Sequence, residues 1–63
     1  MPTPRQVGLI RELLDELEWG RRQIRREIGE EFGDWEELDV ETASELIDAL
    51  IYAKRKLPRE DRF

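Results

Sequence analysis

Apolar residues recur at helical spacing near the start of the chain. Placed at about 100° per residue, they cover an arc of roughly 160°. The members of this arc are Val7, Leu9, Ile10, Leu13, Leu14 and Leu17. Thr3 stands in the position of a helix cap, Pro4 takes the first helical position, and Gln6 follows three residues after the cap. The pattern predicts a helix that begins at Pro4 and is apolar on a face wide enough to contact two neighbours.

The end of this first helix can be placed in two ways. Trp19-Gly20 is typical of a helix stop in which glycine supplies the left-handed residue, and residues 21–28 would then form a short second helix. However, no Ser, Thr, Asp or Asn is present to cap that second helix. If the helix continued through Gly20, Leu17 and Ile24 would lie on the same helical face. A glycine inside a helix lowers its stability by only about 1 kcal/mol relative to alanine. We favour a break at Gly20 and keep one long bent helix as the alternative.

A turn region and a third helix complete the pattern. Gly29, Gly33 and Asp34 mark the turns, and Phe32, Trp35 and Leu38 are expected to be buried between helices. Asp39 is the expected cap of the third helix, with Leu38 packing against Ala43 across it, and Pro58 stops the helix. The expected buried arc consists of Val40, Ala43, Leu46, Ile47, Leu50, Ile51 and Leu57. Residues 58–63 are expected to form a disordered basic tail.

These patterns predict an all-α fold, a compact three-helix domain made by residues 1–63. The alternative is a helical hairpin with one long bent first helix. A chain of 63 residues is near the lower limit for folding alone, because it buries only about 60% of the surface that its unfolded form exposes. A homodimer that joins through the wide apolar arc of the first helix therefore stays open as a further alternative.

Composition removes most kinds of chemistry. The chain has no Cys and no His, which excludes disulfides, thiolate metal sites and the commonest general base. Paired carboxylates serve hydrolysis only in a concave site that excludes water, and so short a chain hardly encloses one. We therefore predict no enzyme, no catalytic residue, no metal site and no cofactor. Apolar runs fall far short of the roughly 20 residues of a membrane-spanning helix, and we expect a soluble, cytoplasmic protein that does not bind membranes.

Charge is divided into blocks along the chain. Residues 1–26 carry six bases and four acids, residues 27–53 carry ten acids and no base, and residues 54–63 carry five bases and two acids. The sum is a formal net charge of −5. Such a block pattern indicates one negative face with basic ends, which would orient the molecule in the field of a partner.

The basic residues of the second helix have two interpretations. Four arginines, Arg21, Arg22, Arg25 and Arg26, stack along one side of a helix and could grip nucleic-acid phosphates. Alternatively they pair with neighbouring acids, since Glu18–Arg22 and Arg26–Glu30 have suitable spacing. The net negative charge favours pairing, so a nucleic-acid site is the weaker prediction. Trp19 and Trp35 flank this segment and could stack on bases, but we favour packing inside the protein for both.

The acidic side of the third helix is the main candidate site. Glu41, Glu45, Asp48 and Tyr52 fall opposite the apolar arc and form an acidic stripe that ends in a phenol. A solvated face with one exposed tyrosine is the plain interpretation. The functional interpretation is a protein-binding site, because tyrosine is enriched at interface hot spots and a row of carboxylates can imitate nucleic-acid phosphates.

Several segments resemble a known type of module. Residues 3–7 (Thr-Pro-Arg-Gln-Val), residues 9–14 (Leu-Ile-Arg-Glu-Leu-Leu), a Trp beside a Gly, and residues 41–50 (Glu-Thr-Ala-Ser-Glu-Leu-Ile-Asp-Ala-Leu) carry the resemblance. Together they resemble a small helical module found at the ends of phage and bacterial DNA-metabolism proteins, including single-strand annealing recombinases, and as stand-alone small phage proteins. The match spans roughly residues 3–51 and consists of caps and core positions. Gly20 follows Trp19 where the module has glycine first, and the doubled arginines also depart from it.

The resemblance and the charge pattern together lead to three hypotheses. The first is a non-enzymatic, phage-derived interaction module that docks on a nucleic-acid-processing protein with a basic surface, through the acidic stripe. The second is a small acidic phage inhibitor, an anti-CRISPR or other anti-defence protein, that imitates nucleic acid. The third is weak direct binding of DNA or RNA through the four arginines, in the manner of SAP-type modules, which the third helix resembles.

Overall fold

The structure is a computed structural model that describes residues 1–56. Its elements are α1 (Pro4–Leu17), α2 (Arg21–Glu27), the short 3-10 helices η1 (Glu30–Phe32) and η2 (Trp35–Glu37), and α3 (Val40–Lys56). The prediction of an all-α, three-helix domain is confirmed. The chain breaks before α2, so the long bent first helix of the alternative does not form.

The beginning of α1 follows its local signals. Gln6 N–H donates to Thr3 Oγ1 at 3.1 Å, and Thr3 N–H donates to Gln6 Oε1 at 3.0 Å. This reciprocal pair is the expected capping box, with Pro4 at the first helical position. Two of the main-chain N–H groups that the first turn leaves without a helical partner are thereby satisfied.

The end of α1 differs from the sequence-based expectation. The left-handed residue is Glu18, with φ 61° and ψ 39°, whereas Gly20 is extended (φ −102°) and precedes α2. Glu18 N–H bonds Asp15 O at 3.2 Å, and Trp19 N–H bonds Leu14 O at 3.0 Å. These two bonds make a Schellman motif, in which the residue after the left-handed one is apolar and packs back on the helix. Because Trp19 takes that apolar position, Glu18 must take the left-handed one.

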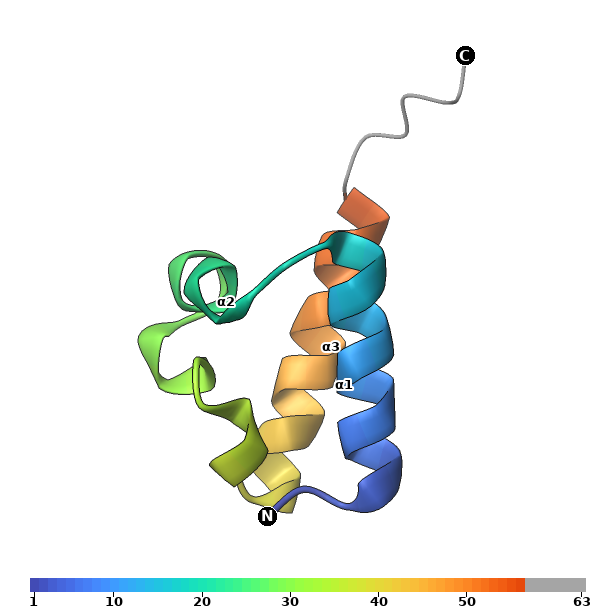
Figure 1. Ribbon diagram of the computed structural model, residues 1–63, viewed down its shortest axis with the longest axis vertical. Helices are drawn as coiled ribbons and strands as arrows, with labels where there is room; N and C mark the ends of the chain where they lie inside the picture. The colour runs from blue at the N-terminus through green and yellow to red at the C-terminus, as the bar shows by residue number, and fades with distance from the viewer. Residues whose placement is uncertain (57–63) are drawn as a thin grey trace.

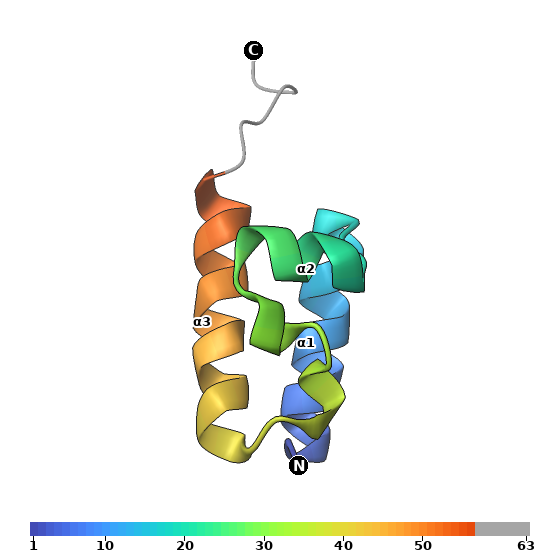
Figure 2. The same ribbon diagram turned by 90° about the vertical axis from the view of Figure 1, so that its left-hand side faces the viewer.

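Helices α1 and α3 lie side by side and run in the same direction (Figure 1). At their starts, Gln6 Nε2 donates to Val40 O at 3.1 Å, and near their ends Lys54 forms an ion pair with Glu16. A parallel pair requires the intervening chain to travel back, and α2, η1 and η2 do so across one side of the α1–α3 pair (Figure 2). The hairpin alternative, with adjacent antiparallel helices, is therefore wrong.

The core lies between the α1–α3 pair and the returning segment. Ile10, Ile24, Leu46 and Leu50 are its largest fully buried side chains, and no polar side chain is buried within residues 1–56. Its remaining members are Leu13, Leu17, Phe32, Trp35, Ala43 and Ile47. Burial of Phe32 and Trp35, and partial burial of Leu38, agrees with their predicted role between helices.

Two predicted core residues are exposed. Val40 is 47% exposed and Leu9 is 38% exposed. Both occupy the edge of the apolar arc of their helix, and Val40 is also the first residue of α3, where its carbonyl accepts a hydrogen bond from Gln6. The cap at Asp39 is confirmed, since Thr42 N–H donates to Asp39 Oδ1 at 2.8 Å. Leu57, the stop at Pro58 and the predicted tail lie outside the described residues. No helix in the described part is long and apolar enough to cross a membrane.

Candidate interaction surface

The four predicted binding residues lie together on α3. Glu41, Glu45, Asp48 and Tyr52 are all exposed, on the side of the helix opposite Leu46 and Leu50. The Tyr52 side chain has 63% of its area exposed. Within the part of the chain that the structure describes, no side-chain hydrogen bond or ion pair engages the three carboxylates. The acidic stripe is thus open to a partner along its whole length.

Other carboxylates, in contrast, are used inside the fold. Arg21 forms an ion pair with Glu36 at 2.8 Å and also donates from Nη1 to Gly33 O at 3.1 Å. Arg25 lies 3.6 Å from Asp34. These contacts join α2 to the turn after η1 and to η2. The predicted pairs Glu18–Arg22 and Arg26–Glu30 do not form within residues 1–56. The arginines that pair are instead Arg21 and Arg25, and their partners come from the returning chain.

The four arginines of α2 therefore fall into two pairs with different surroundings. Arg21 and Arg25 contact the turn region, whereas Arg22 and Arg26 are exposed and form no ion pair within residues 1–56.

The two tryptophans also differ in their burial. Trp35 is buried in the core with 4% of its area exposed, and Trp19 is only half-buried, against the edge of that core.

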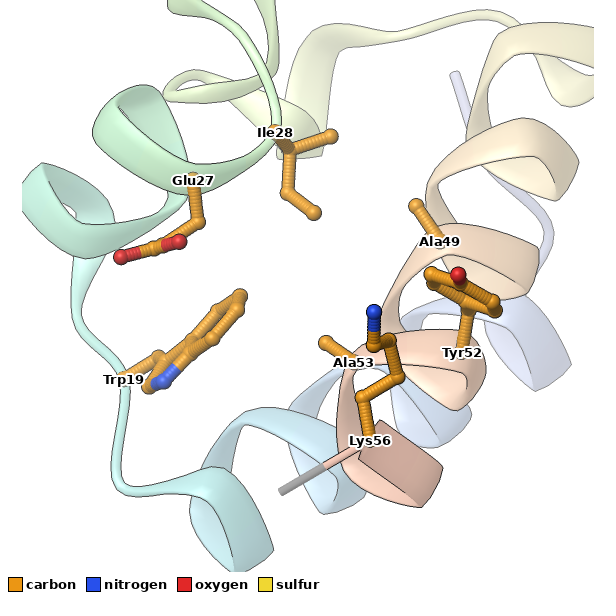
Figure 3. A pocket seen from close by; sticks show the side chains of 7 residues that line it. All are labelled: Trp19, Glu27, Ile28, Ala49, Tyr52, Ala53 and Lys56. Atoms are coloured by element: carbon orange, nitrogen blue, oxygen red, sulfur yellow. The ribbon is translucent and has the colours of Figure 1, made fainter. Parts of the chain in front are cut away.

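A pocket of about 420 Å³ opens beside the stripe, between the α1–α2 connection, the end of α2 and the last turns of α3 (Figure 3). It is lined by Trp19, Glu27, Ile28, Ala49, Tyr52, Ala53 and Lys56. Ala49 and Ala53 are one helical turn apart on α3, and their small side chains leave the space. Trp19 reaches the pocket because the Schellman motif turns the chain toward α3 there. Tyr52 belongs both to the pocket and to the stripe.

Charged groups stand at the mouth of this pocket. Lys56 Nζ lies 5.4 Å from the centroid of the Tyr52 ring, within the range of a cation–π contact. In Figure 3 its ammonium group points between Trp19 and Tyr52, which stand on opposite sides. The Glu27 carboxylate lies on the α2 side and accepts a hydrogen bond from Gln23 Nε2 at 3.0 Å. The pocket thus combines apolar walls, two aromatic rings, one carboxylate and one ammonium group.

Sequence reasoning did not find the pocket. The only signal was the pair of half-buried alanines one turn apart at the border between the apolar and polar sides of α3, next to Tyr52. Nothing in the spacing of Trp19 and Glu27 places them opposite that helix, because the distance along the chain is about thirty residues and the return path sets the contact.

Within residues 1–56, no three acidic side chains gather so as to hold a metal ion. Asp39 has a pKa below its ordinary value of 3.8, chiefly because the Thr42 side chain and then the Thr42 main-chain N–H donate hydrogen bonds to it. That carboxylate is a helix cap and does not line the pocket.

Comparison with known proteins adds no relative. No protein-family model matches the chain, and no curated protein or solved structure has significant similarity to it.

Proposed function

We propose that the chain is a non-enzymatic protein-interaction module that docks through Glu41, Glu45, Asp48 and Tyr52 on a basic surface of a nucleic-acid-processing protein. One observation carries this proposal: the three carboxylates lie in a row on the exposed side of α3 with no partner in the described fold. Acids elsewhere, such as Glu36 and Glu16, are paired with bases. Charge left unpaired on one face is available to steer a partner.

The stripe is long enough to contact a partner along most of the length of α3. From Glu41 to Tyr52 it runs about 16 Å along α3 at 1.5 Å per residue. Tyr52 contributes apolar contact area and a hydroxyl group at one end, and exposed Val40 adds apolar area at the other. The carboxylates would then mainly set orientation and association rate, and the apolar ends would hold the complex. The resemblance to phage modules of DNA metabolism supports a phage-derived module with a nucleic-acid-processing partner.

A second candidate uses the same surface with a different outcome. As a small acidic inhibitor of the anti-CRISPR or anti-defence kind, the chain would occupy the nucleic-acid channel of its target by imitating phosphates. The unpaired row of carboxylates favours this candidate equally. Direct binding of nucleic acid has less support, because Arg21 and Arg25 are already engaged by Glu36 and Asp34.

The test is affinity capture from a lysate of the source organism with matched charge variants. The stripe variant carries Glu41→Gln, Glu45→Gln and Asp48→Asn. The control carries the same types of change at exposed sites away from the stripe: Glu12→Gln, Glu31→Gln and Asp15→Asn. We expect the control to retain the partner and the stripe variant to lose it. Equal recovery of the partner by both variants would remove the stripe from the proposal.

A competition assay then separates the two candidates. The captured partner is loaded with labelled DNA or RNA, and the unlabelled chain is added to saturation. An adaptor leaves the nucleic acid bound, whereas a channel-occluding inhibitor releases it.

A further inference from the structure

The pocket beside the stripe has the lining expected for a cationic side chain. Its Trp19 and Tyr52 rings stand on opposite sides, and aromatic faces attract cations at distances up to about 6 Å. Ile28, Ala49 and Ala53 supply apolar wall, against which the methylene groups of a long basic side chain can pack. Glu27 also lines the pocket from the α2 side, with its carboxylate directed away from the space between the two rings.

The chain already places a cation of its own in this position. Lys56 Nζ lies 5.4 Å from the Tyr52 ring centroid and points into the opening. Lys56 is exposed, and its ammonium group forms no ion pair within residues 1–56. It is therefore held weakly and can be displaced. A volume of about 420 Å³ leaves room for another side chain beside it. This volume lies in the lower part of the range for ligand pockets, about 300–1,000 Å³, and suits a single inserted side chain.

We propose that this pocket binds an arginine side chain of the partner protein. The inference rests on the proposed protein-interaction role and deepens it by naming the anchor. Arginine fits better than lysine for two physical reasons. Its guanidinium group is planar and weakly hydrated, so it stacks between two rings at a small desolvation cost. Its N–H groups also match the two oxygens of a carboxylate, which the exposed Glu27 side chain supplies when it turns toward the pocket.

The position of Tyr52 connects the pocket with the stripe. Because this residue borders both, an arginine that enters the pocket brings its neighbours in the partner onto Glu45 and Asp48. The acidic stripe would attract the basic surface, and the pocket would fix its register. A general preference for basic partners thereby becomes a requirement for one arginine at a defined place.

The test needs no identified partner. The full chain is labelled with ¹⁵N and titrated with the peptide acetyl-Gly-Arg-Gly-amide at low ionic strength, while the indole N–H signals are followed by NMR. Trp19 reports on the pocket, and buried Trp35 is an internal control. We expect saturable movement of the Trp19 signal without movement of the Trp35 signal. The neutral isosteric peptide with citrulline in place of arginine should bind at least about fivefold more weakly.

Four single variants sharpen the test. Glu27→Gln should weaken binding about fivefold, and the control Glu12→Gln, with the same charge change on exposed α1, should stay within about twofold. Ala53→Leu should abolish the Trp19 response, because the larger side chain fills the pocket. Lys56→Met should strengthen binding several-fold, since the resident ammonium no longer competes with the guanidinium group. The effect expected for Lys56→Met is stronger binding, whereas a general loss of structure would weaken binding.

Three outcomes would overturn the proposal. They are a Trp19 signal that does not move, equal binding of the arginine and citrulline peptides, and an affinity that Lys56→Met leaves unchanged or lowers. The proposed function fails separately. If lysate capture depends on the stripe but the peptide leaves Trp19 unmoved, only the pocket inference is wrong. If the peptide binds the pocket but the stripe variant keeps its partner, the pocket stands and the stripe does not.

Discussion

The side-chain amide of Gln6 donates a hydrogen bond to the main-chain carbonyl of Val40, with a distance of 3.1 Å between the two atoms. The same side chain accepts from Thr3 N–H and thereby closes the capping box of α1. The side-chain oxygen of Gln6 thus accepts a hydrogen bond within the cap of α1, and its side-chain nitrogen donates one to α3. This double role joins the starts of α1 and α3 and helps to set them parallel.

The first prediction separates these two roles. Gln6→Glu keeps an acceptor for Thr3 N–H and suits the positive end of a helix, so local reasoning expects it to be neutral or stabilising. The structure predicts the reverse, because a carboxylate cannot donate to Val40 O. We expect a loss of about 1 kcal/mol in the free energy of unfolding, measured with urea at neutral pH. A variant as stable as the parent would show that the tertiary hydrogen bond contributes nothing.

The second prediction concerns the close approach of Arg25 to Gly33. A Cβ placed on Gly33 would lie 2.1 Å from Arg25 Nε and 2.7 Å from its Cγ. The main chain at Gly33 is helical (φ −61°, ψ −39°), so alanine fits the backbone and only the neighbour opposes it. Gly33→Ala should therefore destabilise the chain by about 1 kcal/mol. In an Arg25→Ala background the same change should be neutral or stabilise by about 0.5 kcal/mol.

That change of sign distinguishes a contact with Arg25 from a requirement for glycine itself. The measurement is a double-mutant cycle on the free energy of unfolding. An equal cost of Gly33→Ala in both backgrounds would contradict the prediction.

The third prediction uses the left-handed residue at the end of α1. Glu18 has φ 61°, a conformation that costs an ordinary residue roughly 1–2 kcal/mol and glycine almost nothing. Glu18→Gly should raise the free energy of unfolding by about 1 kcal/mol. The matched control is Glu12→Gly in the middle of α1, which removes the same side chain and should lower stability by about 1 kcal/mol. Both are read from urea unfolding curves, and a loss of stability in both variants would argue against the Schellman motif.

The fourth prediction concerns pH. Because hydrogen bonds from Thr42 lower the pKa of Asp39 in the folded state below 3.8, the ionised cap stabilises the fold fully above that pH. The contribution is lost as the pH falls through the lower pKa of the folded state. Asp39→Ala should therefore melt at a lower temperature than the parent at neutral pH, and the difference should shrink below about pH 3.8.

Asp39→Asn is the control for this titration. It keeps a capping oxygen at every pH, so its melting temperature should lack the part of the acid dependence that comes from residue 39. If Asp39→Ala and the parent differed equally at neutral and acid pH, the ionisation of the cap would have no role.

Local signals determined where the helices begin and which residues form their centre. The caps at Thr3 and Asp39 act within three residues of themselves, and the apolar period alone places Ile10, Leu46 and Leu50 inside. These features depend on interactions between residues close together in the sequence, so they can be predicted from the sequence alone. The edges of the same arcs, at Leu9 and Val40, could not be assigned, since their burial depends on how far the adjacent helix extends.

The tertiary structure decided the direction of the helices, the partners of the arginines and the pocket. Pairs between acids and bases one turn apart on a helix contribute only about 0.2–0.5 kcal/mol, too little to outweigh a better partner elsewhere. Once the core set α1 and α3 parallel, the returning chain brought Asp34 and Glu36 to Arg25 and Arg21. The same return placed Trp19 and Glu27 opposite Tyr52. The acidic stripe could be recognised from the sequence because one helix carries it, whereas the pocket required three separate segments to meet.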